Sequence, residues 1–196
     1  MNQSNKKIAI FASGSGSNAE QITNHFHSQA QKKIEIVLIL TNKSDAFVLE
    51  RAEKLNVPSI VFSREDFYKS DRIVTILTEH QVDLVVLAGF LWLVPANLLT
   101  AFPNRIINIH PALLPKYGGK GMYGEKVHQA VVKNKETETG ITIHLVDEIY
   151  DNGTVLKQAK CGVASEDSPQ DVAEKIHQLE YDYFPITIEK YLMEIC

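Results

Sequence analysis

Asn108 and His110 are two polar residues set two positions apart at the end of an apolar run that begins at Ile106. Residues two apart on a β-strand face the same side of the sheet, so these two side chains would project together. Pro111 cannot continue a central strand, which predicts that the strand stops there and leaves His110 at the edge of the sheet. An amide beside an imidazole can stabilise a developing negative charge and move a proton. The alternative is a histidine with a purely structural role.

A histidine that works as an acid or base near neutral pH needs a carboxylate to raise its pKa and fix its tautomer. Three acidic residues close to one predicted turn are candidates: Asp147, Glu148 and Asp151. Asp151 is the best placed, because Asn152 and Gly153 behind it form a turn that can aim its side chain inward. We therefore expect Asp151 to pair with His110, and a plain turn-forming aspartate is the alternative.

A glycine-rich segment follows the first predicted strand and opens the first predicted helix. Glycine lets the chain turn tightly and approach a ligand, and a helix N-terminus offers unpaired N–H groups with partial positive charge. We expect a phosphate group to bind here, through Gly14, Ser15, Gly16, Ser17 and Asn18. The segment also fits a dinucleotide-binding pattern, but the second predicted strand ends without the acidic residue that would bind a ribose. A strand-to-helix turn without any ligand is the third interpretation.

Short β-branched runs alternate with helical patterns through the first half of the chain. The predicted strands are residues 7–12, 34–41, 58–62, 84–89 and 105–109. This alternation predicts an α/β fold with a Rossmann-like, doubly wound and mostly parallel sheet. Ligands bind such sheets at the carboxyl ends of the strands, which is where the glycine loop, Asn108 and His110 would meet.

The pattern changes toward the C-terminus. Residues 139–146 and 154–163 read as two extended runs around a turn at 150–153, which predicts a C-terminal antiparallel hairpin. A terminal helix follows, with Ser168 as its cap, Pro169 in its first position and Asp171 completing a capping box. Its buried face is predicted from helical spacing, and Pro185 should kink or interrupt it. The residues of that face are Val172, Ile176, Leu179 and Tyr183.

Composition excludes several classes of protein. The 196 residues carry a formal net charge of −4, which argues against non-specific nucleic-acid binding. Two cysteines, Cys161 and Cys196, cannot form a disulfide framework and fit a reducing compartment. The most apolar run, residues 84–94, is shorter than the roughly 20 residues that span a bilayer. We expect a cytoplasmic protein without a metal, nucleic-acid or membrane partner, and with His80, His128 and His177 on its surface.

Residues 108–115, Asn-Ile-His-Pro-Ala-Leu-Leu-Pro, resemble the N-[IV]-H-P-S-L-L-P signature of the folate-dependent formyltransferases. Residues 140–144, followed by Asp151 and Gly153, resemble the second motif of that family, which ends in its catalytic aspartate. The glycine loop, residues 87–90, and Glu180 followed by Pro185 are similar as well. The combination resembles most the branch that formylates 5′-phosphoribosylglycinamide in de novo purine biosynthesis.

The resemblance implies the formyltransferase fold and transfer of a formyl group from 10-formyltetrahydrofolate to the amine of 5′-phosphoribosylglycinamide, without a metal. Asn108 would donate a hydrogen bond to the formyl oxygen, and protonated His110 would stabilise the charge there or pass a proton. Asp151 would hold His110 and raise its pKa. The glycine loop would bind the ribose phosphate and Glu180 the glycinamide end. The folate side would be lined by Arg64, Leu91, Trp92, Leu93, Val94, Asn108, His144, Asp147 and Tyr150.

The resemblance also implies one domain over residues 1–196, a monomer or weak homodimer. Residues 1–104 would form a phosphate-binding half and residues 105–196 a catalytic and folate-binding half. Relatives that formylate methionyl-tRNA or hydrolyse formyltetrahydrofolate share the chemistry, but they carry a further domain for which we expect no room. Departures from the family pattern are Ala112 in place of Ser, Trp92 in place of a frequent Arg, and a long glycine-rich loop at 117–124. A non-catalytic nucleotide-binding module is the remaining alternative, and it would not need the three catalytic candidates to converge.

Overall fold

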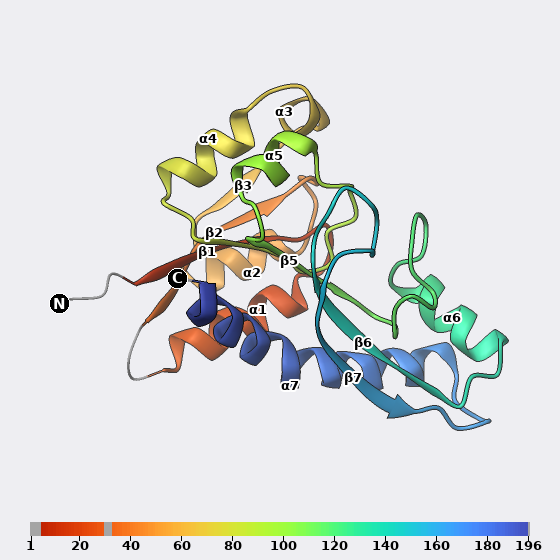
Figure 1. The fold of residues 1–196 in the computed structure, drawn as a ribbon. Helices are drawn as coiled ribbons and strands as arrows, with labels where there is room; N and C mark the ends of the chain where they lie inside the picture. The colour runs from red at the N-terminus through yellow and green to blue at the C-terminus, as the bar shows by residue number, and fades with distance from the viewer. Residues whose placement is uncertain (1–4, 30–32, 196) are drawn as a thin grey trace.

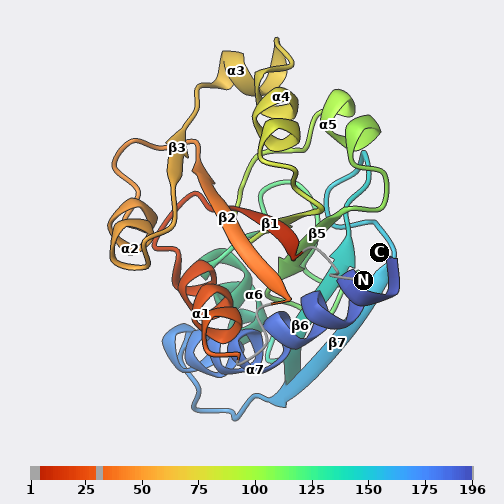
Figure 2. The same ribbon diagram turned by 90° about the vertical axis from the view of Figure 1, so that its left-hand side faces the viewer.

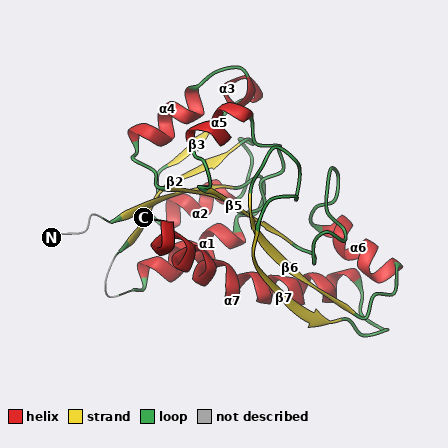
Figure 3. Cartoon of the chain, viewed as in Figure 1, coloured by secondary structure: helices red, strands yellow, loops and turns green. Residues whose placement is uncertain are grey.

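A computed structural model describes residues 5–29 and 33–195, and its centre is one twisted sheet (Figures 1 and 3). Its seven described strands are β1 (Lys6–Phe11), β2 (Ile34–Thr41), β3 (Ser59–Val61), β4 (Leu84–Leu87), β5 (Ile106–His110), β6 (Glu138–Leu145) and β7 (Val155–Gly162). They lie in the order β3-β2-β1-β4-β5-β6-β7, with all pairs from β3 to β5 parallel. The predicted doubly wound, mostly parallel sheet is confirmed. The antiparallel hairpin is confirmed too, because β6 pairs antiparallel with β5 and with β7.

Helices cover both faces of the sheet. The described helices are α1 (Ser17–His27), α2 (Val48–Lys54), α3 (Arg64–Tyr68), α4 (Arg72–Glu79), α5 (Ala96–Ala101), α6 (Glu125–Lys133) and α7 (Pro169–Ile195). Helices α1, α2, α6 and α7 pack on one face, and α3, α4 and α5 pack on the other (Figures 1 and 2). Each face therefore has its own hydrophobic core. Within the described ranges, no helix is both long and apolar enough to cross a membrane.

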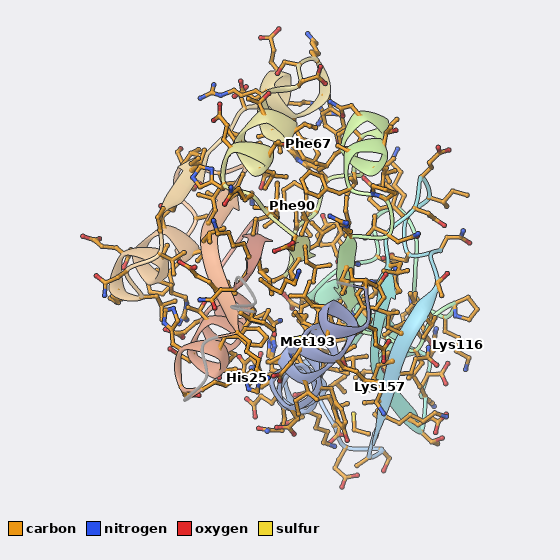
Figure 4. The ribbon with its side chains drawn as sticks, turned by 60° about the vertical axis from the view of Figure 1, so that its left-hand side comes forward. His25, Phe67, Phe90, Lys116, Lys157 and Met193 are labelled. Carbon is orange, nitrogen blue, oxygen red and sulfur yellow. The ribbon has the colours of Figure 1, made fainter. Side chains whose placement is uncertain are left out.

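Apolar burial on the second face is dominated by aromatic rings. Phe67 of α3 and Phe90, both labelled in Figure 4, lie with their ring centroids 5.4 Å apart in an edge-to-face arrangement. Phe11 of β1 lies edge-to-face on Phe90 at 5.4 Å and is tilted against Phe67 at 6.4 Å. Aromatic pairs of this kind stabilise a core by about 0.5–1.5 kcal/mol beyond the area that they bury. These aromatic rings support the segment that follows β4, and that segment lines part of the cavity described below.

Helix α7 begins as predicted but does not end as predicted. Ser168 and Asp171 form the capping box, with Asp171 N–H donating to Ser168 Oγ at 3.2 Å and Ser168 N–H to Asp171 Oδ2 at 2.8 Å. Of the two effects predicted for Pro185, interruption is wrong, because α7 continues through this buried proline to Ile195. A proline inside a helix costs about 3 kcal/mol, and packing of α7 against α1, α6 and strands β5 to β7 offsets that cost.

The buried face of α7 also differs from the prediction. Tyr183 is exposed, and Leu179 packs only at the margin of the core. The buried positions instead repeat every fourth residue: Val172, Ile176, Glu180, Phe184, Ile188 and Leu192. An acidic residue, Glu180, therefore stands in the middle of an apolar stripe, and a buried carboxylate requires hydrogen-bond partners.

The glycine loop joins β1 to α1 at the point where the strand order reverses between β1 and β4. Gly16 has a φ of 74°, in the left-handed region that favours glycine. A Cβ added there would lie 2.3 Å from the Val48 side chain and 3.0 Å from its backbone, whereas one added at Gly14 would have nothing within 4 Å. Position 16 therefore requires glycine for both its backbone conformation and its close approach to Val48, whereas position 14 has room for a side chain.

We predict that Gly16→Ala lowers the free energy of unfolding by about 2–4 kcal/mol, from the left-handed φ and the clash with α2. Gly14→Ala should stay within about 0.5 kcal/mol of the parent chain. Urea denaturation of both variants measures the difference. Equal stability of the two would contradict this account of the loop.

Candidate active site

A cavity of about 570 Å³ lies at the carboxyl ends of β1, β4 and β5 and is bordered by residues 119–124 and by α7. Pairing across the sheet places its parts side by side, because Phe11 is opposite Leu87, Leu87 opposite Asn108, and Asn108 opposite His144. The strands thus bring segments that are far apart in the sequence to one edge. The predicted site residues that line this cavity are Gly14, Ser15, Gly16, Ser17, Asn18, Leu91, Asn108, His110, Tyr150, Asp151 and Glu180.

His110 is held between two acceptors. It is 4% exposed, its Nε2 lies 2.8 Å from the carbonyl oxygen of Tyr117, and its Nδ1 lies 3.4 Å from Oδ1 of Asp151. Because a carbonyl only accepts, Nε2 carries a proton and donates it to Tyr117. The neutral ring would then turn a lone pair toward the carboxylate, whereas the protonated ring would satisfy both contacts. The local geometry therefore suits the imidazolium.

Asp151 reaches His110 from the turn between β6 and β7. Its φ of 55° is one that aspartate tolerates better than most residues, which explains how the turn aims the side chain inward. Its Oδ2 accepts the backbone N–H of Gly119 at 2.9 Å, and its Oδ1 lies 3.8 Å from Nε2 of His144. Burial by itself raises the pKa of Asp151, but the charge of His110 and the N–H of Gly119 help to hold that pKa below its usual value. The carboxylate is thus kept ionised.

The expected rise in the pKa of His110 needs a correction. Burial lowers the pKa of His110 and outweighs the upward effects of Asp151 and of the Tyr117 carbonyl, so the net direction is down. The physical reason is that a nearly inaccessible imidazolium loses most of its hydration. Asp151 acts in the predicted direction but does not dominate.

Asn108 is oriented by His144. Nδ1 of His144 lies 2.8 Å from the carbonyl oxygen of Leu145 and donates to it, so Nε2 is left to accept from Asn108 Nδ2 at 3.1 Å. This contact fixes which end of the Asn108 amide carries the N–H groups. The second N–H of Nδ2 is then available to a ligand, while the ring nitrogens of His144 are both engaged within the protein.

Glu180 connects α7 to the glycine loop. Only 6% of this residue is exposed, and its Oε2 accepts from Asn18 Nδ2 at 2.8 Å and lies 3.2 Å from Nδ1 of His177. The hydrogen bond to Glu180 raises the pKa of His177. Part of the predicted phosphate-binding capacity of Asn18 is therefore committed to holding this carboxylate.

The predicted folate-side residues lie around a neighbouring cavity of about 60 Å³, which shares Phe90, Asn108, Tyr150 and Asp151 with the larger one. Its other predicted residues are Trp92, Leu93, Val94, His144 and Asp147. The carboxylate of Asp147 is used inside the turn, where it accepts from Ile149 N–H and Asn152 Nδ2, both at 2.8 Å. Arg64 lines neither cavity, and its guanidinium instead stacks 5.0 Å from the Tyr68 ring and 5.6 Å from the Trp92 ring.

Sequence reasoning missed three contributors to the site. His128 was expected on the surface, but it is 4% exposed, lines the large cavity, and its Nδ1 has no hydrogen-bond partner among the described residues. Its place beside Val127 and Val131 on the buried face of α6 was the available signal. The carbonyl of Tyr117 and the N–H of Gly119 gave no signal, because a backbone group can come from any residue type.

Within residues 5–29 and 33–195, no three His, Cys, Asp or Glu side chains are grouped in a way that could hold a metal ion. Cys161 is a free, half-buried thiol whose pKa is raised by burial, and Cys196 falls outside the described residues. The large cavity presents the Asn108 amide, the His110 imidazole and the Asp151 carboxylate.

A doubly wound sheet with a glycine loop and a buried histidine–aspartate pair at its carboxyl edge is the arrangement of an α/β enzyme. The family model described as formyl transferase matches residues 6–188. The chain belongs to the formyl transferase family.

Similar proteins within this family carry a more specific name. The chain is 41% identical over 184 residues to the chloroplastic phosphoribosylglycinamide formyltransferase of Arabidopsis thaliana, covering 91% of this chain and 63% of the plant protein. It is 34% identical to the phosphoribosylglycinamide formyltransferase of Bacillus subtilis, covering 95% of each. The crystal structure of the enzyme of that name from Bacillus halodurans superposes with a TM-score of 0.85 at 36% identity, again covering 95% of both chains. This chain thus spans less than two thirds of the plant relative's length but nearly all of the bacterial ones.

We predict that Asp151→Asn lowers the pKa of His110 further, because it removes the charge that opposes the effect of burial. A ¹⁵N titration of the histidine rings measures this, and a pKa that stays constant or rises would contradict the coupling.

The direction in which pH changes the free energy of unfolding follows from the same pKa difference between the folded and unfolded states. Since folding lowers the pKa of His110, its contribution makes the free energy of unfolding fall as pH drops through the unfolded-state value near 6.5.

Proposed function

We propose that the protein transfers the formyl group of 10-formyltetrahydrofolate to the amine of 5′-phosphoribosylglycinamide, a step of de novo purine biosynthesis. The observation that carries the proposal is the convergence of Asn108, His110 and Asp151 on the cavity that the glycine loop also lines. Family membership and the names of the relatives support the same reaction. The predicted cytoplasmic location and the monomer or weak homodimer stay predictions.

The phosphoribosyl end of the acceptor would bind at the glycine loop. Helix α1 begins directly after Gly16, and no side chain caps its first backbone N–H groups. These N–H groups and the helix dipole favour an anion at this end. Next to them, Glu180 would accept hydrogen bonds from the amine end of the substrate. This order suits a molecule with a phosphate at one end and an amine at the other.

The formyl donor would bind on the side of the smaller cavity, against the segment from Leu91 to Val94 and the turn that carries Tyr150. The walls there combine apolar side chains such as Trp92 and Val94 with the polar side chains of Asn108 and His144, which suits a flat heteroaromatic ring. The donor would thereby present its formyl group to Asn108, which borders both cavities.

In the proposed reaction the substrate amine attacks the formyl carbon. A bond forms between that nitrogen and carbon, the bond from the formyl carbon to the folate nitrogen breaks, and one amine proton ends on the folate nitrogen. The free N–H of Asn108 would donate to the oxygen on which negative charge develops. That charge would favour the imidazolium form of His110 beside it, and the His110–Asp151 pair would carry the proton between the two nitrogens.

Two alternative functions fit less well. A hydrolase of formyltetrahydrofolate needs water in place of the amine, and it would leave the glycine loop and Glu180 without a purpose. A non-catalytic nucleotide-binding module does not require the three catalytic candidates to meet, whereas His110 Nδ1 and Asp151 Oδ1 are 3.4 Å apart. We therefore favour formyl transfer to a phosphorylated amine.

The direct test is to incubate the protein with 10-formyltetrahydrofolate and 5′-phosphoribosylglycinamide and to follow loss of the formylfolate. We expect turnover that depends on both substrates. A rate no higher than that of the His110→Ala variant would overturn the proposal. Loss of formylfolate without the acceptor would indicate the hydrolase instead.

We predict that Asn108→Ala lowers kcat about 10²- to 10³-fold, the usual effect of removing one donor to a developing oxyanion. Substrate KM values should change little, because the contact strengthens only as charge develops. Asn97→Ala on α5, away from both cavities, serves as the matched control. If loss of the Asn108 side chain raises KM and leaves kcat unchanged, this residue binds substrate and does not stabilise charge.

We predict that Glu180→Gln raises KM for 5′-phosphoribosylglycinamide about 10- to 100-fold, because a charge-assisted hydrogen bond to the amine end is weakened. KM for the formyl donor should stay within a factor of two or three. Glu189→Gln, a change of the same kind on α7, is the control, since Glu189 pairs with His25 outside the cavity. Equal effects on both substrates would indicate that Glu180 shapes the cavity as a whole.

A further inference from the structure

The short segment Tyr117–Gly119 contacts both members of the proposed catalytic pair through its backbone. The Tyr117 carbonyl oxygen lies 2.8 Å from Nε2 of His110, and the Gly119 N–H donates to Oδ2 of Asp151 at 2.9 Å. Gly118 between them has little free space, since an added Cβ would lie 2.5 Å from the Leu114 side chain and 3.4 Å from Asp151 Cβ. The position of this segment therefore sets the position of the pair.

Tyr117 has a φ of 56°, an uncommon conformation for a bulky aromatic residue. Such a conformation persists only where the surroundings hold it. The side chain provides the hold, because its hydroxyl donates to Oε1 of Glu136 at 2.9 Å and accepts from Nδ2 of Asn134 at 2.8 Å. Hydrogen bonds from Tyr117 and Lys116 also lower the pKa of Glu136, so this carboxylate is a charged acceptor.

The anchor lies outside both cavities. Asn134 and Glu136 belong to the turn between α6 and β6 and line neither the large cavity nor the small one. Lys116 of the adjoining segment is at the outer edge of the molecule in Figure 4 and is exposed. Tyr117 thus spans from a surface turn to the imidazole at the centre of the site.

We propose that Tyr117 is a positioning residue of the formyl-transfer site: its hydroxyl, fixed by Glu136 and Asn134, aims its carbonyl so that His110 keeps its proton on Nε2 and turns Nδ1 to Asp151. The proposal rests on the function proposed above for its catalytic consequence, but the contact itself is a property of the free protein. Tyr117 touches no reacting atom and acts through His110.

The groups that face His110 define what a loosened Tyr117 would change. They are Asp151 from the turn between β6 and β7, His144 from β6, Glu180 from α7 and the Tyr117 carbonyl itself. The carbonyl and the two carboxylates raise the pKa of His110, while burial and His144 lower it. Without a fixed carbonyl, the protonated ring loses one of its two acceptors, and its pKa falls.

The test compares Tyr117→Phe and Glu136→Ala with Lys116→Met. The first two remove the anchor, whereas the third removes only an exposed partner of the same carboxylate, and such ion pairs contribute about 0–1 kcal/mol. Histidine ¹⁵N shifts of the free protein report which nitrogen of His110 is protonated, with His110→Ala used to assign its signals. The pH dependence of kcat reports the same group during turnover.

In Tyr117→Phe and Glu136→Ala, we expect a lower pKa of His110 with loss of the fixed Nε2 proton. We also expect kcat to fall about tenfold while KM stays within a factor of three. Lys116→Met should match the parent in the pKa of His110 and in kcat. Glu136→Gln, whose amide oxygen still accepts a hydrogen bond from Tyr117, should lie closer to the parent than Glu136→Ala in both quantities. Unchanged His110 shifts in a folded Tyr117→Phe chain would overturn the proposal, even if activity fell.

The ¹⁵N measurement needs no substrate, so the two proposals fail separately. If the parent and the variants all lack formyl transfer, the proposed function is overturned. If the ¹⁵N shifts of His110 nevertheless change in the variants, the positioning role of Tyr117 stands. Normal turnover in the parent with an unresponsive His110 would do the reverse.

Discussion

The burial of an imidazole between a carboxylate and a backbone carbonyl is the constraint on which the rest of the site depends. Removing His110 from water opposes its charge, and Asp151 together with the Tyr117 carbonyl opposes that effect. Because coulombic energies in a buried site change steeply with distance, the upward effect of these two groups on the pKa of His110 depends on their exact positions. A rigid frame is therefore needed on every side of the ring, and the fold supplies it from four separate parts of the chain.

The sheet provides most of that frame. Parallel strands place the loop after β1 and the end of β5 at one edge. Strand β6 runs antiparallel past His110 and ends with Leu145 opposite Ile107, and the loop between β6 and β7 then brings Asp151 back to His110. The loop between β6 and β7 is thus what brings the carboxylate to the imidazole. The pairing of Asn108 with His144 across β5 and β6 also orients the amide.

Much of this arrangement was predictable from the sequence, because it follows from short-range rules. Strand alternation predicted the sheet, the two-residue spacing predicted a common direction for Asn108 and His110, and Asn152-Gly153 predicted a turn that aims Asp151 inward. The failures have physical causes in common. Pro185 continues α7 and His128 is buried because tertiary packing overrides local propensity at both residues. The net pKa direction of His110 depends on how deeply the fold buries it, and no pattern of residue types gives that depth.

Charge placement along the cavity explains how a chain of net charge −4 could select an anionic substrate and orient it. One end of the cavity presents the unpaired N–H groups of α1, which favour an anion, and no excess of basic side chains is needed for that. Two largely buried carboxylates, Glu180 beside Asn18 and Asp151 beside His110, line the same cavity and attract an amine. A ligand that carries both groups therefore has one favourable orientation. In that orientation its amine would come toward the amide of Asn108. A basic surface attracts a phosphate without fixing its orientation. Here the backbone N–H groups and the buried carboxylates together would both attract the ligand and orient it.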